Sequence, residues 1–208
     1  DRQWMLVDQK GRFLSQRQLP QMSLIETAIT EHQLILSANG VENLTLALAP
    51  KKEEERAVSI WNDQCMSWRV SKTADEWLSD VLNCACQLVY QPQHHTRLID
   101  QNFGTPSGQI YFSDGFPFLL ISDSSLTSLN SAMNLSLPMS RFRPNLVITN
   151  CPGYAEDFWR EIQLGEISFR LPKPCSRCAI TTIDTTTGLM GKEPLSTLNR
   201  LRKWHNNK

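Results

Sequence analysis

The chain has 208 residues, of which 40% are hydrophobic and 20% are charged, a composition typical of globular domains. Lysine plus arginine and aspartate plus glutamate each number 21, so the formal net charge is zero. This balance disfavours general nucleic-acid binding, which depends on a basic surface. No apolar run approaches the length of about 20 residues that a membrane-spanning helix requires, so we expect no membrane partner.

Six cysteines are too few for the disulfide framework of a small secreted domain, and their spacing is uneven. A reducing, cytoplasmic setting is therefore the simpler expectation. Residues 1–7 already read as a strand from the interior of a fold, with no leader before them. We therefore expect the sequence to be a piece of a longer protein. The cysteines are Cys65, Cys84, Cys86, Cys151, Cys175 and Cys178.

The first 90 residues predict short strands connected by turns. Leu44, Leu46 and Leu48 alternate with other residues, which gives a strand one buried face, and Asn39-Gly40 before them is a strong hairpin signal. The charged residues 51–56 are expected to form a solvated loop. Other strands are expected at residues 4–7, 13–14, 34–36, 58–61 and 68–70.

Residues 73–76 (Thr-Ala-Asp-Glu) match a capping box, in which side chains bind the first backbone N–H groups of a helix. The helix that follows would bury an apolar face made of Trp77, Leu78, Val81 and Leu82. A polar, loop-like segment covers residues 92–106. We place a domain boundary near residue 90, which divides the chain into domains 1–90 and 91–208.

The second domain is expected to mix strands with helices, so the predicted fold class is mixed β/α and mostly β. A helix capped by Asp123 or Ser124 would follow a buried strand at residues 118–121. Gly165 is expected at the turn of a hairpin, and Pro194 in the first turn of a last helix. Further strands are expected at residues 146–148 and 179–183.

The compact reactive motif is Lys173-Pro174-Cys175-Ser176-Arg177-Cys178. Its two thiols could share a metal, form a disulfide, leave one thiol as a lone ligand, or have no function. Arg177 and Lys173 would favour thiolate, the form that binds soft metals. A zinc site would need a second ligand pair, and its candidates, Cys84 and Cys86 with His94 and His95, have an unusual spacing. The sequence contains no P-loop and no dinucleotide-binding fingerprint.

Two further segments carry groups suited to a ligand. Arg143, within residues 141–145 (Arg-Phe-Arg-Pro-Asn), could donate two hydrogen bonds to a phosphate or carboxylate. Asn145 offers both donors and an acceptor to a heterocycle. Residues 113–115 (Ser-Asp-Gly) are either a simple turn or a loop whose backbone amides approach a ligand. Taken singly, the Arg143–Asn145 segment is better explained as a surface arginine before an Asn-capped strand start.

Together, residues 114–120, 141–147 and 173–178 resemble the molybdenum-cofactor sulfurase C-terminal (MOSC) superfamily. Residues 1–7 and 17–20 resemble the N-terminal domain that accompanies MOSC domains. Within the superfamily, the chain is similar nearly end to end to the bacterial YcbX-type proteins and the mitochondrial amidoxime-reducing component. The resemblance implies an N-terminal β-barrel-like domain followed by a MOSC β-barrel with flanking helices, each incomplete at its outer end.

The resemblance implies a molybdenum cofactor, a pterin dithiolene that holds an oxo-molybdenum centre with one protein cysteine as a further ligand. The matching cysteine is Cys178, the second of the pair. Asp114 matches a loop residue beside the metal, where it could help to deliver a proton. A Pro-Val-Lys-Ser-like segment that binds the cofactor in the family has no counterpart here. The residues that match cofactor contacts are Arg2, Arg17, Asp114, Gly115, Phe116, Arg143, Asn145, Ser176 and Arg177.

The function that the resemblance implies is reduction of N-hydroxylated compounds such as amidoximes, hydroxylamines and hydroxylated nucleobases. Electrons would come from an iron–sulfur cluster in a ferredoxin-like domain or from a flavin reductase, both outside this chain. At the superfamily level the resemblance also extends to pyridoxal phosphate binding. Three alternatives stay open: a sulfur carrier with a persulfide on Cys178, a module that binds or delivers the cofactor without turnover, and a thiol–disulfide pair of Cys175 and Cys178.

Overall fold

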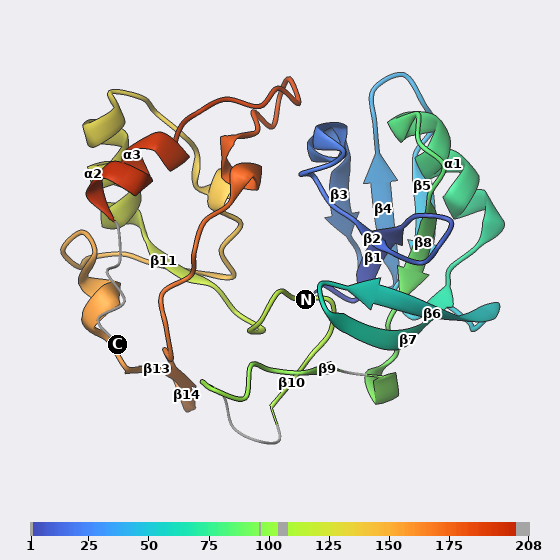
Figure 1. The fold of residues 1–208 in the computed structure, drawn as a ribbon, viewed down its shortest axis with the longest axis horizontal. Coiled ribbons are helices and arrows are strands. Elements are labelled where there is room, and N and C mark those ends of the chain that lie inside the picture. Colours follow the sequence, from blue (N-terminus) through green and yellow to red (C-terminus); the bar gives the residue numbers. More distant parts are fainter. Residues whose placement is uncertain (1, 96, 104–107, 203–208) are drawn as a thin grey trace. The chain divides into compact units, whose positions relative to one another are not determined.

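The computed structural model describes residues 2–95, 97–103 and 108–202. The chain forms two compact units (Figure 1). The first unit comprises Asp1–Asp100, Thr105–Pro117 and Thr185–Leu189, and the second comprises Gln101–Gly104, Phe118–Asp184 and Met190–Lys208. In the described residues strands outnumber the α-helices, which confirms the mixed β/α, mostly β class. None of these helices is long and apolar enough to cross a membrane. The boundary near residue 90 stays a prediction.

The first unit is built on a five-stranded antiparallel sheet. Its strand order is β2 (Phe13–Leu14), β1 (Trp4–Val7), β8 (Gln87–Tyr90), β7 (Asp63–Arg69) and β6 (Glu54–Ile60). A second antiparallel sheet has the order β3 (Glu26–Ile29), β4 (Gln33–Ser37) and β5 (Leu44–Ala47). A short pair is formed by β9 (Arg97–Leu98) and β10 (Gln109–Ile110), and η1 (Pro20–Leu24) and η2 (Gln93–His95) are 3-10 helices.

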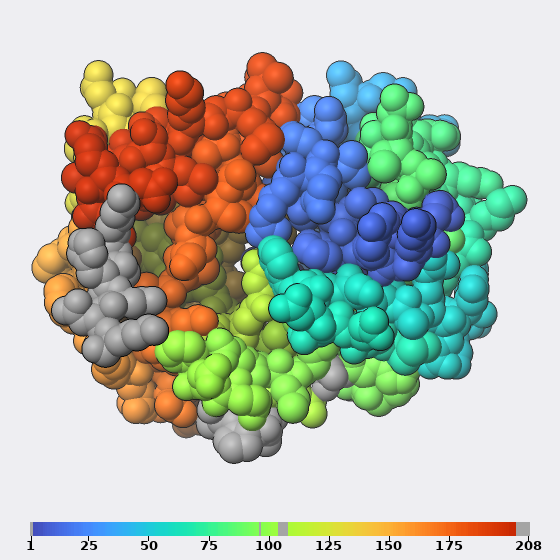
Figure 2. Space-filling view, viewed as in Figure 1, coloured from blue at the N-terminus to red at the C-terminus, as the bar shows by residue number. Residues whose placement is uncertain are grey.

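The β6–β7 hairpin corrects one sequence prediction. Residues 54–56, expected in a solvated loop, are the first residues of β6 and pair with the end of β7. Their side chains are mostly exposed, and an antiparallel strand with a solvated face accepts charged residues. The hairpin, turquoise in Figure 2, therefore lies at the surface of the first unit.

Apolar side chains fill both faces of the five-stranded sheet. Successive residues of a strand point to opposite faces, so Leu6 belongs to one buried cluster, whereas Met5 and Val7 belong to another. The first cluster also contains side chains of β4, β5 and α1 (Lys72–Leu82), which cover that face. The alternating burial of Leu44 and Leu46 confirms the pattern predicted for β5.

The N-cap of α1 is Ser71, so the prediction that the capping box at Thr73 opens the helix is wrong. The Ser71 hydroxyl accepts a hydrogen bond from the backbone N–H of Ala74 at 3.1 Å. This bond satisfies one of the donors that a helix leaves open at its N-terminus. The helix ends at Asn83, whose backbone is left-handed with φ 46°, a conformation that asparagine tolerates better than most residues.

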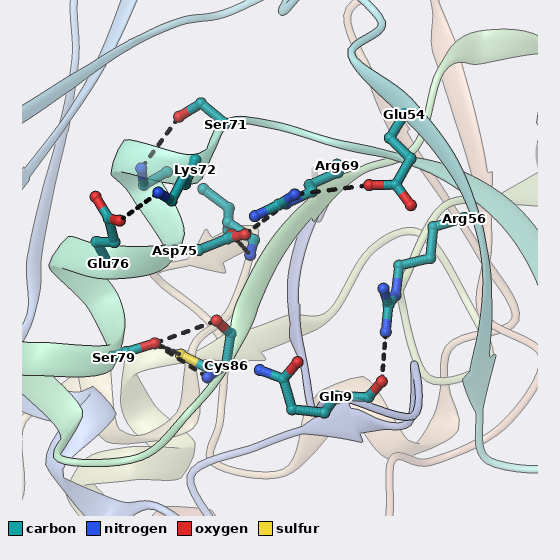
Figure 3. A network of polar contacts seen from close by, with 12 residues as sticks. Gln9, Glu54, Arg56, Arg69, Ser71, Lys72, Asp75, Glu76, Ser79 and Cys86 are labelled. Carbon is teal, nitrogen blue, oxygen red and sulfur yellow. Dashed lines mark hydrogen bonds and ion pairs between the residues drawn. The ribbon is translucent and has the colours of Figure 1, made fainter.

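A buried carboxylate joins α1 to the sheet (Figure 3). Asp75 is 6% exposed. Its Oδ2 accepts a hydrogen bond from Arg69 Nε at 2.6 Å, and its Oδ1 accepts one from the backbone N–H of Leu88 at 2.7 Å. These charge-assisted bonds offset the cost of removing the carboxylate from water. The neighbouring Glu76, in contrast, meets Lys72 at 3.3 Å where both side chains are exposed.

We expect Asp75→Ala to lower the free energy of unfolding by about 3 kcal/mol, because Arg69 and the N–H of Leu88 both lose a buried acceptor. Glu76→Ala on the same helix is the matched control, and loss of its exposed ion pair is expected to cost less than about 0.5 kcal/mol. Urea denaturation of both variants at neutral pH measures the difference. Similar losses in the two variants would contradict the role given to Asp75.

The second unit combines short strand pairs with helices. β11 (Leu120–Ser122) pairs in parallel with β12 (Leu146–Ile148), and α2 (Asp123–Met133) directly follows β11. β13 (Glu161–Leu164) and β14 (Ile167–Arg170) form the hairpin predicted around Gly165. Three 3-10 helices, η3 (Met139–Phe142), η4 (Ala155–Phe158) and η5 (Ala179–Thr182), precede α3 (Leu195–Leu201), whose N-cap is Pro194.

The segment after Cys178 is a 3-10 helix, so the prediction of a strand at residues 179–183 is wrong. The Thr181 hydroxyl donates to the Cys178 carbonyl at 2.9 Å, and the Thr182 hydroxyl donates to the Ala179 carbonyl at 2.8 Å. These local bonds satisfy backbone acceptors within a tight turn, although β-branched residues usually favour strands.

The helix α2 begins at two serines that share one carboxylate. Its N-cap is Ser122, whose hydroxyl accepts from the N–H of Ser125 at 3.1 Å, so the prediction of Asp123 or Ser124 is wrong. Glu156 accepts from the Ser122 N–H at 3.1 Å and from the Ser125 hydroxyl at 2.6 Å. Burial by itself raises the pKa of Glu156, but hydrogen bonds from Ser125, its own backbone and Ser122 outweigh burial and lower the pKa.

We expect this carboxylate to make stability depend on pH. Because the folded pKa of Glu156 is depressed, its contribution is fully present above the unfolded pKa and is lost as the pH falls through the folded pKa. Glu156→Gln should therefore be less stable than wild type near neutral pH, and this difference should shrink toward about pH 3. Thermal denaturation of wild type and Glu156→Gln over this pH range measures the difference in stability. A difference that stays constant with pH would contradict the assignment.

Candidate functional site

Cys178 lies at the start of η5 and is half-buried, whereas Cys175 is exposed. The backbone of Cys178 is extended, and its carbonyl accepts from the Thr181 N–H at 3.1 Å and from the Thr181 hydroxyl at 2.9 Å. None of the six cysteines, all within the described residues, forms a disulfide. The thiol at position 178 is therefore held on a well-bonded turn and not on the strand expected there.

Arg177 joins the cysteine segment to η3. Its Nη2 donates to the Phe142 carbonyl at 2.6 Å, and its guanidinium lies 5.5 Å from the centre of the Phe142 ring. Its Nη1 lies 3.5 Å from the Cys175 sulfur. The Nε of Arg177 is buried and has no hydrogen-bond partner among the described residues. The residue that precedes Cys178 thus carries one buried donor with no acceptor among the described residues.

The segment that follows η3 carries Arg143 and Asn145. Arg143 is exposed and adopts a left-handed backbone with φ 53°. Asn145 is exposed but fixed, because its N–H donates to the Leu119 carbonyl at 2.8 Å and its Oδ1 accepts from the Leu119 N–H at 3.0 Å. The Arg177–Phe142 hydrogen bond links two segments of the second unit. One segment carries Arg143 and Asn145, and the other carries Ser176, Arg177 and Cys178.

The first unit connects Arg17 and Asp114 through Trp61. The Trp61 Nε1 donates to Asp114 Oδ1 at 3.3 Å, and the Arg17 guanidinium lies 4.7 Å from the centre of a Trp61 ring. Phe13 packs against the same side chain, with ring centroids 4.9 Å apart. Trp61 lies in the β6–β7 turn with a left-handed backbone and is 46% exposed. A cation, an indole and a carboxylate are therefore in contact at this turn.

Arg97 holds the Asp114 loop and the β6–β7 turn in place. This side chain is 7% exposed. Its Nε donates to Asp63 Oδ2 at 2.9 Å, and its Nη1 donates to the carbonyls of Tyr111 at 3.1 Å and Ser113 at 3.0 Å. Asp63 follows the turn that carries Trp61, and Ser113 precedes Asp114. One buried guanidinium therefore fixes the chain next to both members of the Trp61–Asp114 hydrogen bond.

The remaining predicted residues of the first unit lie in its loops. Arg2 is half-buried with φ 57°, and its carbonyl accepts from the Phe112 N–H at 3.0 Å. Gly115 and Phe116 are half-buried in the loop after Asp114. In the described residues no three His, Cys, Asp or Glu side chains gather closely enough to hold a metal ion by themselves.

Three residues that organise the site, Trp61, Arg97 and Arg141, were not predicted from the sequence. Arg141 donates to the Thr181 carbonyl at 3.4 Å and to Asp184 Oδ2 at 3.0 Å. An aromatic residue in a short turn between two strands is a usable signal for Trp61. Arg97 and Arg141 carry no comparable signal, because a buried arginine is not distinguishable from a surface arginine without knowing its acceptors.

The family comparisons match both halves of the chain. Residues 1–85 match the MOSC N-terminal beta barrel domain, and residues 107–207 match the MOSC domain. Mitochondrial amidoxime-reducing component 1 of Mus musculus is 33% identical over 214 residues, which cover 97% of this chain and 61% of the relative.

Human relatives give a similar result. Component 1 of Homo sapiens is 33% identical over 209 residues, covering 98% of this chain and 62% of the relative. Component 2 of Homo sapiens is 29% identical, covering 97% of this chain and 62% of the relative. The chain thus spans about three fifths of the length of these relatives. With both domain matches in order and this similarity along nearly its whole length, the chain belongs to the MOSC superfamily, as an N-terminal β-barrel domain followed by a MOSC domain.

Proposed function

We propose that this chain is part of a molybdenum-cofactor-dependent reductase of N-hydroxylated compounds. The relatives support the substrate class, since they are named amidoxime-reducing components. The observation that carries the proposal is that the half-buried thiol of Cys178 directly follows Arg177 in the sequence, and that the Nε–H of Arg177 is buried without a partner among the described residues. A soft metal within an anionic organic ligand suits both groups.

The charge and hydrogen-bonding capacity around Cys178 fit such a cofactor. A buried donor without an acceptor is unfavourable, and an incoming anionic acceptor would satisfy the Nε–H of Arg177 with a charge-assisted bond. Arg143 follows Phe142, the residue whose carbonyl binds Arg177, so two guanidinium groups belong to one pair of connected segments. Guanidinium forks match phosphate oxygens well. The residues present therefore fit a phosphorylated pterin that carries a thiolate-bound metal.

Each predicted site residue of the second unit has a defined role in this proposal. Cys178 supplies its sulfur to the metal, while Arg143 and Arg177 supply positive charge. The Oδ1 of Asn145 already accepts from Leu119, so its amide N–H groups are the part that donates to a ligand. Ser176 offers its backbone and hydroxyl beside the sulfur. When bound, the cofactor supplies two-electron reduction of the N–O bond.

Asp114 is proposed to deliver a proton. Cleavage of an N–O bond with release of water consumes two protons, so a positioned acid is useful. The indole of Trp61 binds Asp114 Oδ1 and limits rotation of the carboxyl group, which leaves Oδ2 for proton transfer. Contacts of Arg2, Arg17, Gly115 and Phe116 with the cofactor stay predictions.

The electron supply is also part of the proposal. An iron–sulfur cluster in a ferredoxin-like domain or a flavin reductase would provide the two electrons. The cytoplasmic setting and pyridoxal phosphate binding stay predictions.

Cys178→Ser and its matched control Cys175→Ser, in the whole protein that carries this chain, test the proposal. We expect Cys178→Ser to lower bound molybdenum and benzamidoxime reduction by about 100-fold, because a hydroxyl is a harder, less readily ionised ligand than a thiol. Cys175→Ser should keep most of its metal and activity, since that thiol is exposed and makes only long contacts, at 3.5 Å with Arg177 Nη1 and at 3.6 Å with the Ser176 carbonyl. Elemental analysis and benzamidine formation are the measurements.

These two variants, together with the wild-type protein, separate the alternatives. Equal losses in both variants would indicate a thiol–disulfide pair. Cyanide-labile sulfur on Cys178 without any need for molybdenum would indicate a sulfur carrier. Full cofactor content with no turnover under any reductant would indicate a binding or delivery module. Retained metal and activity in Cys178→Ser would overturn the proposal outright.

A further inference from the structure

Two arginines connect η3 and the segment 177–182, which contains η5, in opposite directions. Arg177, beside Cys178, donates to the backbone carbonyl of Phe142 at 2.6 Å. Arg141, beside Phe142, donates from Nη1 to the backbone carbonyl of Thr181 at 3.4 Å. Each segment therefore contributes a cation that binds a main-chain acceptor of the other segment. We call Arg141–Thr181 and Arg177–Phe142 the reciprocal arginine contacts.

Arg141 is the more deeply buried member of this arrangement. Its side chain is 9% exposed, and its charge is balanced by Asp184, whose Oδ2 lies 3.0 Å from Nη2 and whose side chain is 43% exposed. A guanidinium in this position must keep its hydrogen bonds, because an unpaired buried charge is strongly unfavourable. Thr181, its other partner, is 2% exposed. The position of Thr181 is thus fixed from one side by Arg141.

Thr181 in turn fixes Cys178. Both its N–H and its hydroxyl donate to the Cys178 carbonyl, at 3.1 Å and 2.9 Å. A carbonyl with two donors cannot rotate without losing both bonds, and its rotation is coupled to the direction of the adjoining Cα–Cβ bond. The direction of the Cα–Cβ bond that carries the sulfur therefore depends on a chain of contacts that runs from Arg141 through Thr181 to the backbone of Cys178.

We propose that Arg141 is a positioning residue that sets the orientation of the Cys178 sulfur without touching any ligand. The functional meaning of this orientation rests on the proposed role of Cys178 as a metal ligand. The orientation itself does not, because every contact in the chain belongs to the protein. A ligand held by a fixed surrounding shell binds its metal better than one whose direction is left free.

Thiol reactivity tests the proposal independently of the cofactor. In the cofactor-free protein, Arg141→Met should raise the rate of iodoacetamide alkylation at Cys178 about tenfold, equivalent to about 1.4 kcal/mol of local opening. Alkylation at Cys175, measured by mass spectrometry of the same samples, should change little because that thiol is already exposed. Thr181→Val removes only the hydroxyl bond, and should raise reactivity at Cys178 by a smaller factor.

Asp184→Asn is the matched control, since it removes the charge partner of Arg141 and leaves the Thr181 contact possible. Its effect on Cys178 should be smaller than that of Arg141→Met at similar thermal stability. If Arg141→Met does not fold, Arg141→Lys and Thr181→Val carry the test alone. Unchanged reactivity of Cys178 in the folded variants, or equal rises at Cys175 and Cys178, would overturn the proposal.

Molybdenum content separates this inference from the function on which it rests. Faster alkylation in Arg141→Met together with weaker molybdenum retention supports both the positioning role of Arg141 and the proposed role of Cys178 as a metal ligand. If Arg141→Met is alkylated faster but wild type binds no molybdenum, the positioning role is kept and the proposed cofactor is rejected. If wild type binds molybdenum through Cys178 but Arg141→Met shows the same alkylation rate as wild type, only the positioning role is rejected.

Discussion

The buried guanidinium of Arg141 constrains the second unit, because a charge removed from water must keep all of its hydrogen-bond partners. Among the described residues of this unit, the buried apolar side chains are Leu129, Phe142, Ile183 and Pro194. The buried polar residues are Ser122, Ser125, Arg141, Thr181, Thr182 and Thr197. Apolar contacts tolerate small shifts, whereas hydrogen bonds weaken steeply with distance and angle. The polar groups therefore define the positions of η3 and η5 more sharply than the apolar groups can.

The first unit is stabilised differently, yet it uses the same kind of residue next to its candidate site. Two apolar clusters fill the faces of its sheet, and Asp75 joins the helix to that sheet. In the separate β9–β10 pair, buried Arg97 binds the carbonyls of Tyr111 and Ser113, directly before Asp114. Arg141 binds the carbonyl of Thr181, three residues after Cys178. In both units a guanidinium with several N–H donors fixes the backbone beside a proposed functional side chain.

Local alternation of apolar residues was sufficient to predict the strands around Leu44 and Leu46 and the hairpin at Gly165. The predicted start of α1 is wrong, because Ser71 and Thr73 both offer a hydroxyl and only the backbone geometry decides which one caps the helix. The strand predicted after Cys178 failed for a related reason. Threonine favours strands on average, but its hydroxyl also binds a nearby carbonyl, and at Thr181 and Thr182 that local bond prevails. The errors thus lie where side chains compete with the backbone for hydrogen bonds.

The candidate site shows the same limit in its arginines. Arg141 and Arg143 are two residues apart, and sequence reasoning selected Arg143 because it matches a family motif. Between them the chain leaves η3 through a left-handed residue at position 143, which turns Arg143 to the exposed surface while Arg141 stays buried. No pattern in the sequence predicts that turn, since left-handed backbone is uncommon for arginine. A motif can therefore identify the arginine that would meet an anionic cofactor, but the arginine that orients the neighbouring thiol is identifiable only from its acceptors.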